Sequence, residues 1–484
     1  MRHSGAARHY RWARIIARMS PALRPLAAIT LALAAACVAA QGLPAEVEAA
    51  LARAKLPRDA LSVLVVEAEG KAAPRVSHRA GVAVNPASVA KLVTTYAALD
   101  QLGPAFTWST PVYVDGVVQG GTLAGNVYLQ GQGDPKLVVE RLWLLLRRIQ
   151  GLGITQIQGD IVLDHSAFET VHQDAGAFDG EPLRPYNAAP DALLLNFKAV
   201  VMTFVPDRGG RAQIQYEPPL AGVQTSPSVA LGAGDCGDWR AGLKADFSDP
   251  GRIRFAGSYP SSCGERAWPV AYAEPKSYAA RAVAGLWSEM GGKLSGQVRD
   301  GRTPASLRPA FTLQSPSLAE IVRDINKFSN NVMAQQLFLT LSLQQKGIGT
   351  QEGSREIVRT WWRERVGGEP PGFDNGSGLS RDERITAQQL ARLLQVAWAS
   401  PLMPELISSL PVAGTDGTLR RMRGRSAGLA HLKTGSLRDV AAVAGIVHAA
   451  SGRRYVLVAI ANHPNAVVAR PAIDALIEWT ARDQ

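Results

Sequence analysis

The stretch Asn85-Pro86-Ala87-Ser88-Val89-Ala90-Lys91-Leu92-Val93-Thr94-Thr95-Tyr96 organises the rest of the sequence. Asn85 is a good N-cap and Pro86 suits the first helical position, so the two predict the start of a helix. Ser88 then lies in the first turn, where unpaired backbone N–H groups and the positive end of the helix dipole can stabilise an oxyanion. Lys91 follows on the same face, and the apolar stripe beyond it would bury the amine. A desolvated lysine can act as a base toward a serine hydroxyl.

An S-x-x-K string also arises by chance in a chain of 484 residues, so this pair alone does not establish a catalytic site. Two further strings add weight to it. Ser329-Asn330-Asn331 lies in a helical or helix-loop stretch, and Lys433-Thr434-Gly435-Ser436 lies on a predicted strand. S-x-N is common and uninformative alone, whereas K-T-G is rare by chance. The order, spacing and context of the three strings together form the informative signal.

The N-terminus reads as a secretory signal peptide over residues 1–40. Arg24 precedes an apolar run at 26–39, and Val38-Ala39-Ala40 forms a small-residue cleavage site. The lead upstream is long and arginine-rich, and Met19 is an alternative start that gives a signal of ordinary length. No later segment has the ~20 apolar residues that a membrane span needs, so we expect an exported, periplasmic chain with no transmembrane anchor after cleavage.

The composition, with 46% hydrophobic and 19% charged residues, is that of a globular protein of two or three domains. Six arginines in residues 1–40 account for over half of the formal net charge of +11. The mild positive charge that remains, without an RNA- or DNA-binding motif, gives no reason to expect a nucleic-acid partner, and it suits work near an anionic cell-wall polymer. The oligomeric state stays unknown.

Three cysteines are present. Cys37 lies in the signal peptide, within a poor lipoprotein site. Cys236 and Cys263 form an even pair in an exported chain, so we expect a disulfide between them, with two free buried thiols as the alternative.

Strand patterns occur near both ends of the chain, at residues 61–66, 75–78, 429–435, 440–449 and 455–461. Helical patterns occur at residues 45–54, 276–290, 317–344, 353–366, 386–399 and 471–481. This arrangement predicts an α+β fold, in which one antiparallel sheet is built from both chain ends and flanked by helices. Residues 106–275 change to short strands and turns, with one helix at about 137–151, and predict a β-rich insertion of two subdomains. The main domain would then be discontinuous, at 41–105 and 276–484.

The strings S-x-x-K, S-x-N and K-T-G, in this order, resemble those of penicillin-binding proteins and serine β-lactamases. The long gap between Ser88 and Ser329, with the segments 131–135, 374–381 and 410–419, resembles one family more closely: the D-alanyl-D-alanine carboxypeptidase/endopeptidases of the class C low-molecular-mass penicillin-binding proteins, peptidase family S13. The resemblance implies a β-lactamase/DD-peptidase-like fold, and we expect no metal and no cofactor. It also implies that the chain cleaves peptidoglycan stem peptides and cross-links through an acyl-enzyme and is acylated by β-lactam antibiotics such as penicillin.

The resemblance also implies a role for each motif residue. Ser88 would be acylated by the penultimate D-Ala carbonyl and Lys91 would take its proton, although the acylation base is disputed across the superfamily. Ser329 would relay a proton to the leaving amine, and Asn331 would hold Lys91 and the substrate amide.

The third string would recognise the substrate. Lys433 and Thr434 would bind its terminal carboxylate, while the strand backbone pairs with the extended peptide. The backbone N–H groups of Ser88 and Ser436 would form the oxyanion hole. Where this family often has Asp in the second string, this chain has Asn330, and we expect no consequence.

Other strings are weaker candidates. Residues 424–428 spell G-x-S-x-G but precede a strand, whereas a nucleophile elbow follows one. The eight histidines show no metal-ligand spacing, and residues 131–135 read as a turn and not as a phosphate loop. Arg381 and Asp134 could touch substrate, but such residues after a glycine turn are more often structural.

Two alternative functions remain open. A β-lactamase of the same fold needs a way to place the deacylating water, and no Glu-bearing loop motif is assignable to that task. A non-catalytic cell-wall-binding scaffold has no need of Ser88 and Lys91 together.

Overall fold

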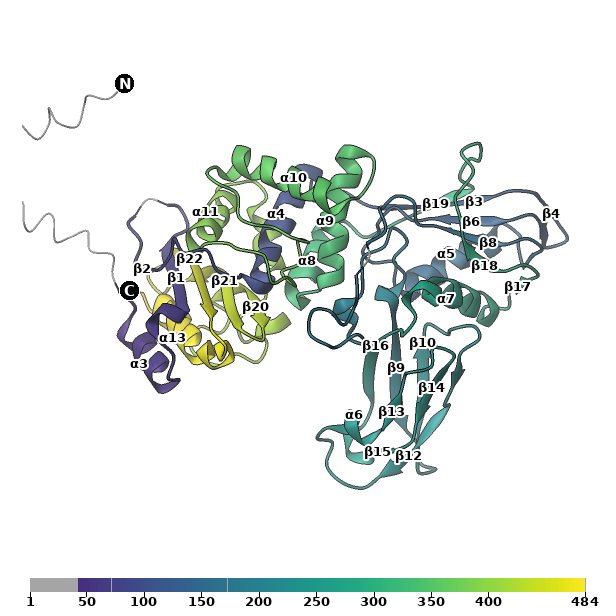
Figure 1. The fold of residues 1–484 in the computed structure, drawn as a ribbon, viewed down its shortest axis with the longest axis horizontal. Coiled ribbons are helices and arrows are strands. Elements are labelled where there is room, and N and C mark those ends of the chain that lie inside the picture. Colours follow the sequence, from purple (N-terminus) through teal and green to yellow (C-terminus); the bar gives the residue numbers. More distant parts are fainter. Residues whose placement is uncertain (1–41, 71, 172, 484) are drawn as a thin grey trace, which may run out of the picture.

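The computed structural model describes residues 42–483 apart from residues 71 and 172. The expected signal peptide, with Met19 and Cys37, lies outside the described residues. The described chain forms an α+β part and a strand-rich part that extends away from it (Figure 1). We call the first part, residues 42–108 and 315–483, the sheet domain, and the second part, residues 109–314, the insertion.

The sheet domain is built on a five-stranded antiparallel sheet. Its strands, in spatial order, are β2 (Val76–His78), β1 (Leu61–Glu67), β22 (Arg454–Asn462), β21 (Val440–His448) and β20 (Ala430–Leu437). β1 pairs with β22, with Leu61 opposite Ala461. The prediction of one antiparallel sheet built from both chain ends is therefore confirmed.

Helices cover both faces of this sheet (Figure 1). One face carries α3 (Ala45–Arg53) and α13 (Arg470–Ala481). The other carries α4 (Lys91–Leu102), α8 (Leu318–Phe328), α9 (Asn331–Lys346), α10 (Gln351–Trp361), α11 (Ala387–Trp398) and α12 (Met403–Ser409). Alternate residues of β1 serve the two layers, because Val63 and Val65 pack under α3 and α13 while Leu64 and Val66 face the other helices. Burial on both faces explains the continuous apolar runs of the central strands.

The segment around Ser88 begins differently from the prediction. Ala87–Ala90 form a 3-10 turn, η2, and the α-helix begins only at Lys91. The Ala87 N–H donates to Asn85 Oδ1 at 2.9 Å, so Asn85 forms an Asx turn that leads into η2 and does not cap the α-helix.

The predicted helix over 317–344 is two helices, α8 and α9, which are separated at Ser329 and Asn330. Ser329 has a left-handed φ of 57°. The Asn330 side chain accepts a hydrogen bond from the Met333 N–H at 3.1 Å, as an N-cap does. Ile325 and Met333 nevertheless pack in the same apolar cluster, so the helical periodicity continues across the break and conceals it.

The described residues of the insertion hold four sheets. Their strand orders are β18-β8-β6-β3-β19, β17-β7-β5-β4, β15-β12-β10-β9-β16 and β11-β14-β13. The strands are β3 (Ser109–Val114), β4 (Val117–Gln119), β5 (Thr122–Ala124), β6 (Val127–Gln130), β7 (Gln156–Ile157), β8 (Ile161–Asp164), β9 (Ala199–Pro206), β10 (Arg211–Glu217), β11 (Gln224–Thr225), β12 (Ser228–Gly232), β13 (Ala245–Asp246), β14 (Arg252–Phe255), β15 (Ser258–Pro260), β16 (Arg266–Ala271), β17 (Lys293–Leu294), β18 (Val298–Asp300) and β19 (Phe311–Gln314). The helices are α5 (Val139–Gly151), α6 (Trp239–Gly242) and α7 (Pro275–Glu289).

The insertion extends further than residue 275, where the sequence placed its end. β19 pairs with β3, the first strand of the insertion, and β18 pairs with β8. α7 packs in the same apolar cluster as α5. The periodicity at 276–290 predicts a helix but does not show which core it faces. These contacts favour a boundary near residue 314, and the division of the chain into domains stays a prediction. Strands of the β18-β8-β6-β3-β19 sheet and of the β15-β12-β10-β9-β16 sheet share this one cluster, and the division of the insertion into two subdomains stays a prediction.

Cys236 and Cys263 form a disulfide within the insertion, as predicted. Among the residues from 42 to 483 that the structure describes, none of the helices combines the length and apolar character that crossing a bilayer requires.

Candidate active site

Ser88 lies in the η2 turn and is partly exposed. The backbone of this turn is in close contact with two other segments, at Gly435 and Gly378. At Gly435 on β20, a Cβ atom would lie 2.9 Å from the Pro86 carbonyl oxygen and 3.2 Å from the Ser88 nitrogen. At Gly378, a Cβ atom would lie 2.1 Å from the Ala87 carbonyl oxygen, so no side chain fits there. These glycines let two backbones approach the turn and fix the position of the serine.

Lys91 is completely buried directly behind Ser88. Its Nζ donates hydrogen bonds to Ser88 Oγ at 3.0 Å, to Asn331 Oδ1 at 2.6 Å and to the Ser377 carbonyl oxygen. Burial lowers the pKa of Lys91 to about 7, and the nearby Glu383 carboxylate partly opposes this effect. A large share of the amine is therefore neutral at neutral pH and able to accept the hydroxyl proton.

The second string lies at the break between α8 and α9. Its left-handed backbone turns Ser329 toward β20, and Ser329 Oγ accepts a hydrogen bond from Lys433 Nζ at 2.8 Å. Asn331, the first residue of α9, holds Lys91 and also donates from Nδ2 to the Tyr186 carbonyl oxygen at 3.5 Å. Because Tyr186 belongs to the insertion, the insertion reaches the candidate site.

The third string lies on β20, at the edge of the sheet. Lys433 is completely buried and also donates to the Thr434 carbonyl oxygen at 2.7 Å. Burial, reinforced by the positive charge of Lys91, lowers the pKa of Lys433 well below its usual value. Thr434 Oγ1 donates to Thr418 Oγ1 at 2.7 Å, while Ser436 is exposed further along the strand.

The structure thus brings five of the seven predicted site residues into two hydrogen-bonded groups. Ser88, Lys91 and Asn331 form one group and Ser329 with Lys433 forms the other. Thr434 and Ser436 share the strand of Lys433. In the described part of the chain, neither of these two is bonded to Ser88 or Lys91.

Sequence reasoning missed Ser377, Tyr186 and Glu383. The first two act through backbone carbonyls, which leave no residue-type signal. Ser377 lies in the segment 374–381 that supported the resemblance, so its neighbourhood, though not its role, was detectable.

Arg381 and Asp134 are held by structural contacts. Arg381 pairs with Asp439 at 3.1 Å, and its guanidinium stacks 4.6 Å from the centre of the Phe178 ring. Asp134 is buried in the turn at 131–135, where it accepts the Lys136 N–H at 2.8 Å. Burial raises the pKa of Asp134 to about 6.

The remaining candidate strings show no reaction centre. Ser426 of the G-x-S-x-G string is buried and donates to Glu478 Oε1 at 2.6 Å, as a loop anchor. Within the described residues, His, Cys, Asp and Glu form no group of three or more that could hold a metal ion.

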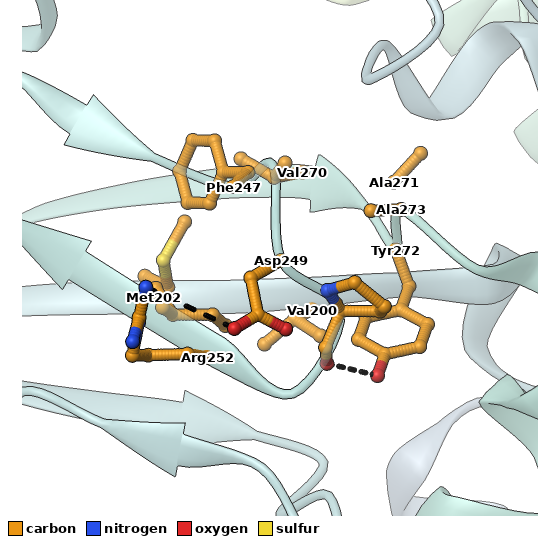
Figure 2. A pocket seen from close by; sticks show the side chains of 11 residues that line it. Val200, Met202, Phe247, Asp249, Arg252, Val270, Ala271, Tyr272 and Ala273 are labelled. Carbon is orange, nitrogen blue, oxygen red and sulfur yellow. Dashed lines mark hydrogen bonds and ion pairs between the residues drawn. The ribbon is translucent and has the colours of Figure 1, made fainter.

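Two hollows are lined wholly or mainly by residues of the insertion. A small apolar pocket of about 20 Å³ is lined by side chains such as Met202, Phe247 and Arg252, and has room for about one water molecule (Figure 2). A second, of about 890 Å³, is lined in part by Asp191, which pairs with His165 at 2.5 Å and Lys198 at 2.9 Å. No motif residue lines either hollow.

The chain is similar to several known proteins. The model of the D-Ala-D-Ala carboxypeptidase 3 (S13) family matches residues 43–483. The D-alanyl-D-alanine carboxypeptidase of Actinomadura sp. strain R39 is 27% identical over 388 residues, 76% of this chain and 71% of that relative. Penicillin binding protein 4 from Haemophilus influenzae has the same fold, with a TM-score of 0.70 at 22% identity over 89% of this chain and 99% of its own. A penicillin G-acylated predatory endopeptidase from Bdellovibrio bacteriovorus gives a TM-score of 0.51 at 18% identity over 87% of this chain and 93% of its own.

Proposed function

Because this chain belongs to the D-Ala-D-Ala carboxypeptidase 3 (S13) family of serine-type hydrolases, we propose that Ser88 is the nucleophile with which it cleaves peptidoglycan stem peptides. The observation that carries the proposal is the buried amine of Lys91, 3.0 Å from Ser88 Oγ. A neutral amine at this distance is the paired base that an active serine requires.

Acylation follows from these contacts. Lys91 Nζ takes the hydroxyl proton while Ser88 Oγ attacks the carbonyl carbon of the penultimate D-Ala. The backbone N–H groups of Ser88 and Ser436 hold the oxyanion. When the tetrahedral intermediate collapses, the C–N bond breaks and Ser329 Oγ–H protonates the leaving amine. The hydrogen bond from Lys433 Nζ provides Ser329 with a replacement proton.

Deacylation repeats the same steps with water. Between the two half-reactions Lys91 loses its proton to the solvent, and Lys433 regains from the solvent the proton that it gave to Ser329. Lys91 then takes a proton from the incoming water, whose oxygen attacks the ester carbon. The ester C–O bond breaks and Ser88 recovers its proton. A β-lactam acylates Ser88 in the same way, but its opened ring stays attached to the acyl group.

Recognition of the substrate is assigned to β20. The exposed side of an edge strand pairs with an extended peptide, and Thr434 Oγ1 meets the terminal carboxylate in the field of the Lys433 ammonium. Since Lys433 is buried, it acts mainly through the electrostatic field of its charge and through its hydrogen bond to Ser329.

We propose that the enzyme works in the periplasm and also cuts peptide cross-links. The sequence at 1–40 supports export, and the name of the Bdellovibrio relative in fold, an endopeptidase, supports the second activity. The insertion, which meets Asn331 through Tyr186, would select how polymeric peptidoglycan approaches Ser88.

Labelled penicillin tests the proposal. Mass spectrometry of the digested protein should find one acyl group, on Ser88, and Ser88→Ala should lose both the label and the peptidase activity. Ser408→Ala, at an exposed serine of α12, is the matched control and should keep both. A labelled peptide elsewhere in the chain would refute the assignment, and rapid release of hydrolysed penicillin would favour the β-lactamase alternative.

A further inference from the structure

Glu383 is a buried carboxyl group for which the proposed reaction has no use so far. It is 1% exposed. Its Oε1 accepts a long hydrogen bond, 3.4 Å, from the Asp374 N–H, and the Asn375 N–H also favours the ionised carboxylate. Its Oε2 is buried without a hydrogen-bond partner. In the described chain no lysine, arginine or histidine forms an ion pair with it. An unpaired carboxylate is costly in such a place, so Glu383 must either hold a proton or share the charge of a nearby cation.

The charged groups around Glu383 leave one candidate for that cation. Asp374 is negative, and its own partner is Arg355, at 3.6 Å. The Arg384 side chain turns away to the carbonyl oxygens of Arg381 and Glu383. Of the buried amines, Lys91 is the one whose charge acts on Glu383, and the charge of Lys91 also acts on the second buried amine, Lys433. Burial and the charge of Asp374 raise the pKa of Glu383 to about 7, against the opposing effect of Lys91.

The segment that carries Glu383 also grips Lys91. The Ser377 carbonyl oxygen accepts a hydrogen bond from Lys91 Nζ, and the Gly376 carbonyl oxygen accepts one from Thr94 Oγ1 at 2.7 Å. Asn375 Oδ1 in turn accepts from the Ser377 N–H at 3.0 Å and so fixes the carbonyl. Lys91 and Glu383 are therefore held by one loop, packed on α4.

We propose that Glu383 is a positioning residue that sets the protonation state of Lys91 by sharing one proton with it inside the sheet domain. The pair can hold this proton as ammonium with carboxylate or as neutral amine with carboxylic acid, with no change in total charge. The neutral arrangement leaves Lys91 ready to accept the proton of Ser88, whereas the charged arrangement holds Lys91 protonated. The balance between the two arrangements therefore sets how much free base is present. This inference rests on the proposed role of Lys91 as the base.

The test is the pH dependence of acylation by penicillin in the full chain. Lys91 must be unprotonated to react, so the rate falls as the pH falls through the pKa of Lys91. Ionised Glu383 raises that pKa, so in Glu383→Gln the fall of the acylation rate at low pH, the acid limb of the pH profile, should move to lower pH by up to about one unit. The acid limb should also become as narrow as the titration of a single proton. Glu383→Asp keeps the charge and should keep the limb near that of the wild type. Asp382→Asn, at the exposed neighbouring carboxylate, is the matched control and should not move it.

An unmoved limb in Glu383→Gln, or an equal loss of rate at every pH, would show a purely structural role and overturn the inference. If Glu383→Gln does not fold, as judged by its melting curve, the wild type decides. Two coupled groups spread its acid limb over a wider pH range than one proton does, and a simple one-proton limb contradicts the pairing. These outcomes differ from failure of the proposed function, because that failure would appear as penicillin bound at a residue other than Ser88.

Discussion

The sheet domain and the insertion bury different kinds of side chain. The sheet domain buries Lys91, Lys327 and Lys433, none of them more than 4% exposed, together with Glu383. In the described residues of the insertion, the buried charges are Asp134 and Asp164, which accept backbone N–H groups within turns. Its core is aromatic instead: Phe204 packs against Trp239, Phe255 and Tyr259. Buried amines are costly, and two of these three, Lys91 and Lys433, belong to the candidate active site, whereas the core of the insertion holds a shape.

The strongest test of this difference is Lys91→Ala. Removal of the base should slow acylation by penicillin by about 10²–10⁴-fold.

Lys433→Ala should instead weaken cleavage of peptides with a free terminal carboxylate, and it should affect a substrate without that carboxylate less. Stopped-flow acylation and peptide hydrolysis would measure both. Equal losses of rate in Lys91→Ala and Lys433→Ala on a substrate that lacks the carboxylate would contradict the separate roles.

Replacement of residues 110–313 by a Gly/Ser linker should separate the two parts. The cut spares Trp108, which packs in the core of the sheet domain. We expect penicillin acylation to change only a few-fold, while activity on intact sacculi falls more than activity on a small D-Ala-D-Ala peptide. Circular dichroism would verify the fold of the truncated chain. A folded truncation that does not react with penicillin would make the insertion part of the reaction centre.

The disulfide offers a smaller perturbation, confined to the insertion. Because Cys236 and Cys263 lie 27 residues apart in the sequence, the double change to serine should lower the stability of the insertion by about 3 kcal/mol through loop entropy. The rate of penicillin acylation should not change. Urea unfolding and acylation, measured on the same sample, would check this, and two free thiols in the oxidised wild-type protein would refute the pairing.

The smallest expected effect concerns the third buried lysine, Lys327. Its Nζ lies 2.6 Å from Asp416 Oδ2. Burial opposes ionisation of Asp416, but the hydrogen bonds from Lys327 and the Val412 N–H outweigh it and hold the pKa of Asp416 below its usual value. The pair therefore adds stability above the ordinary aspartate pKa and loses it as the pH falls through the lowered value. Asp416→Asn should cost about 1–2 kcal/mol at pH 7, as Asp416 is partly exposed, and less near pH 3. An equal cost at both pH values in urea titrations would rule out the ion pair as the cause.

The sequence predicted the central sheet because its strands are apolar runs bounded by turns, at 61–66 and at three places after 429. It predicted the residues around Ser88 because their chemistry requires particular side chains at fixed spacing. It could not predict the end of the insertion near residue 314, since a helix such as α7 shows in sequence that it has an apolar face but not which core that face meets.

Contacts made by backbone carbonyl oxygens could not be predicted from the sequence either. The carbonyls of Ser377 and Tyr186 could belong to any residue. Glu383 was overlooked because a lone glutamate in a polar segment, Arg381-Asp382-Glu383-Arg384, reads as solvated, and only tertiary packing buries it.

The sheet joins β1 to β22, almost four hundred residues apart in the chain, and this sets the order in which the molecule can form. The insertion is continuous in sequence and has its own apolar core, so it can fold before the rest of the chain has been synthesised. β20, which carries Lys433, can pack against Ser329 and the turn of Ser88 only when the C-terminal strands have been synthesised. We therefore expect an incompletely delivered chain to carry a finished insertion and no peptidase activity, so that the enzyme becomes active only when its synthesis is complete.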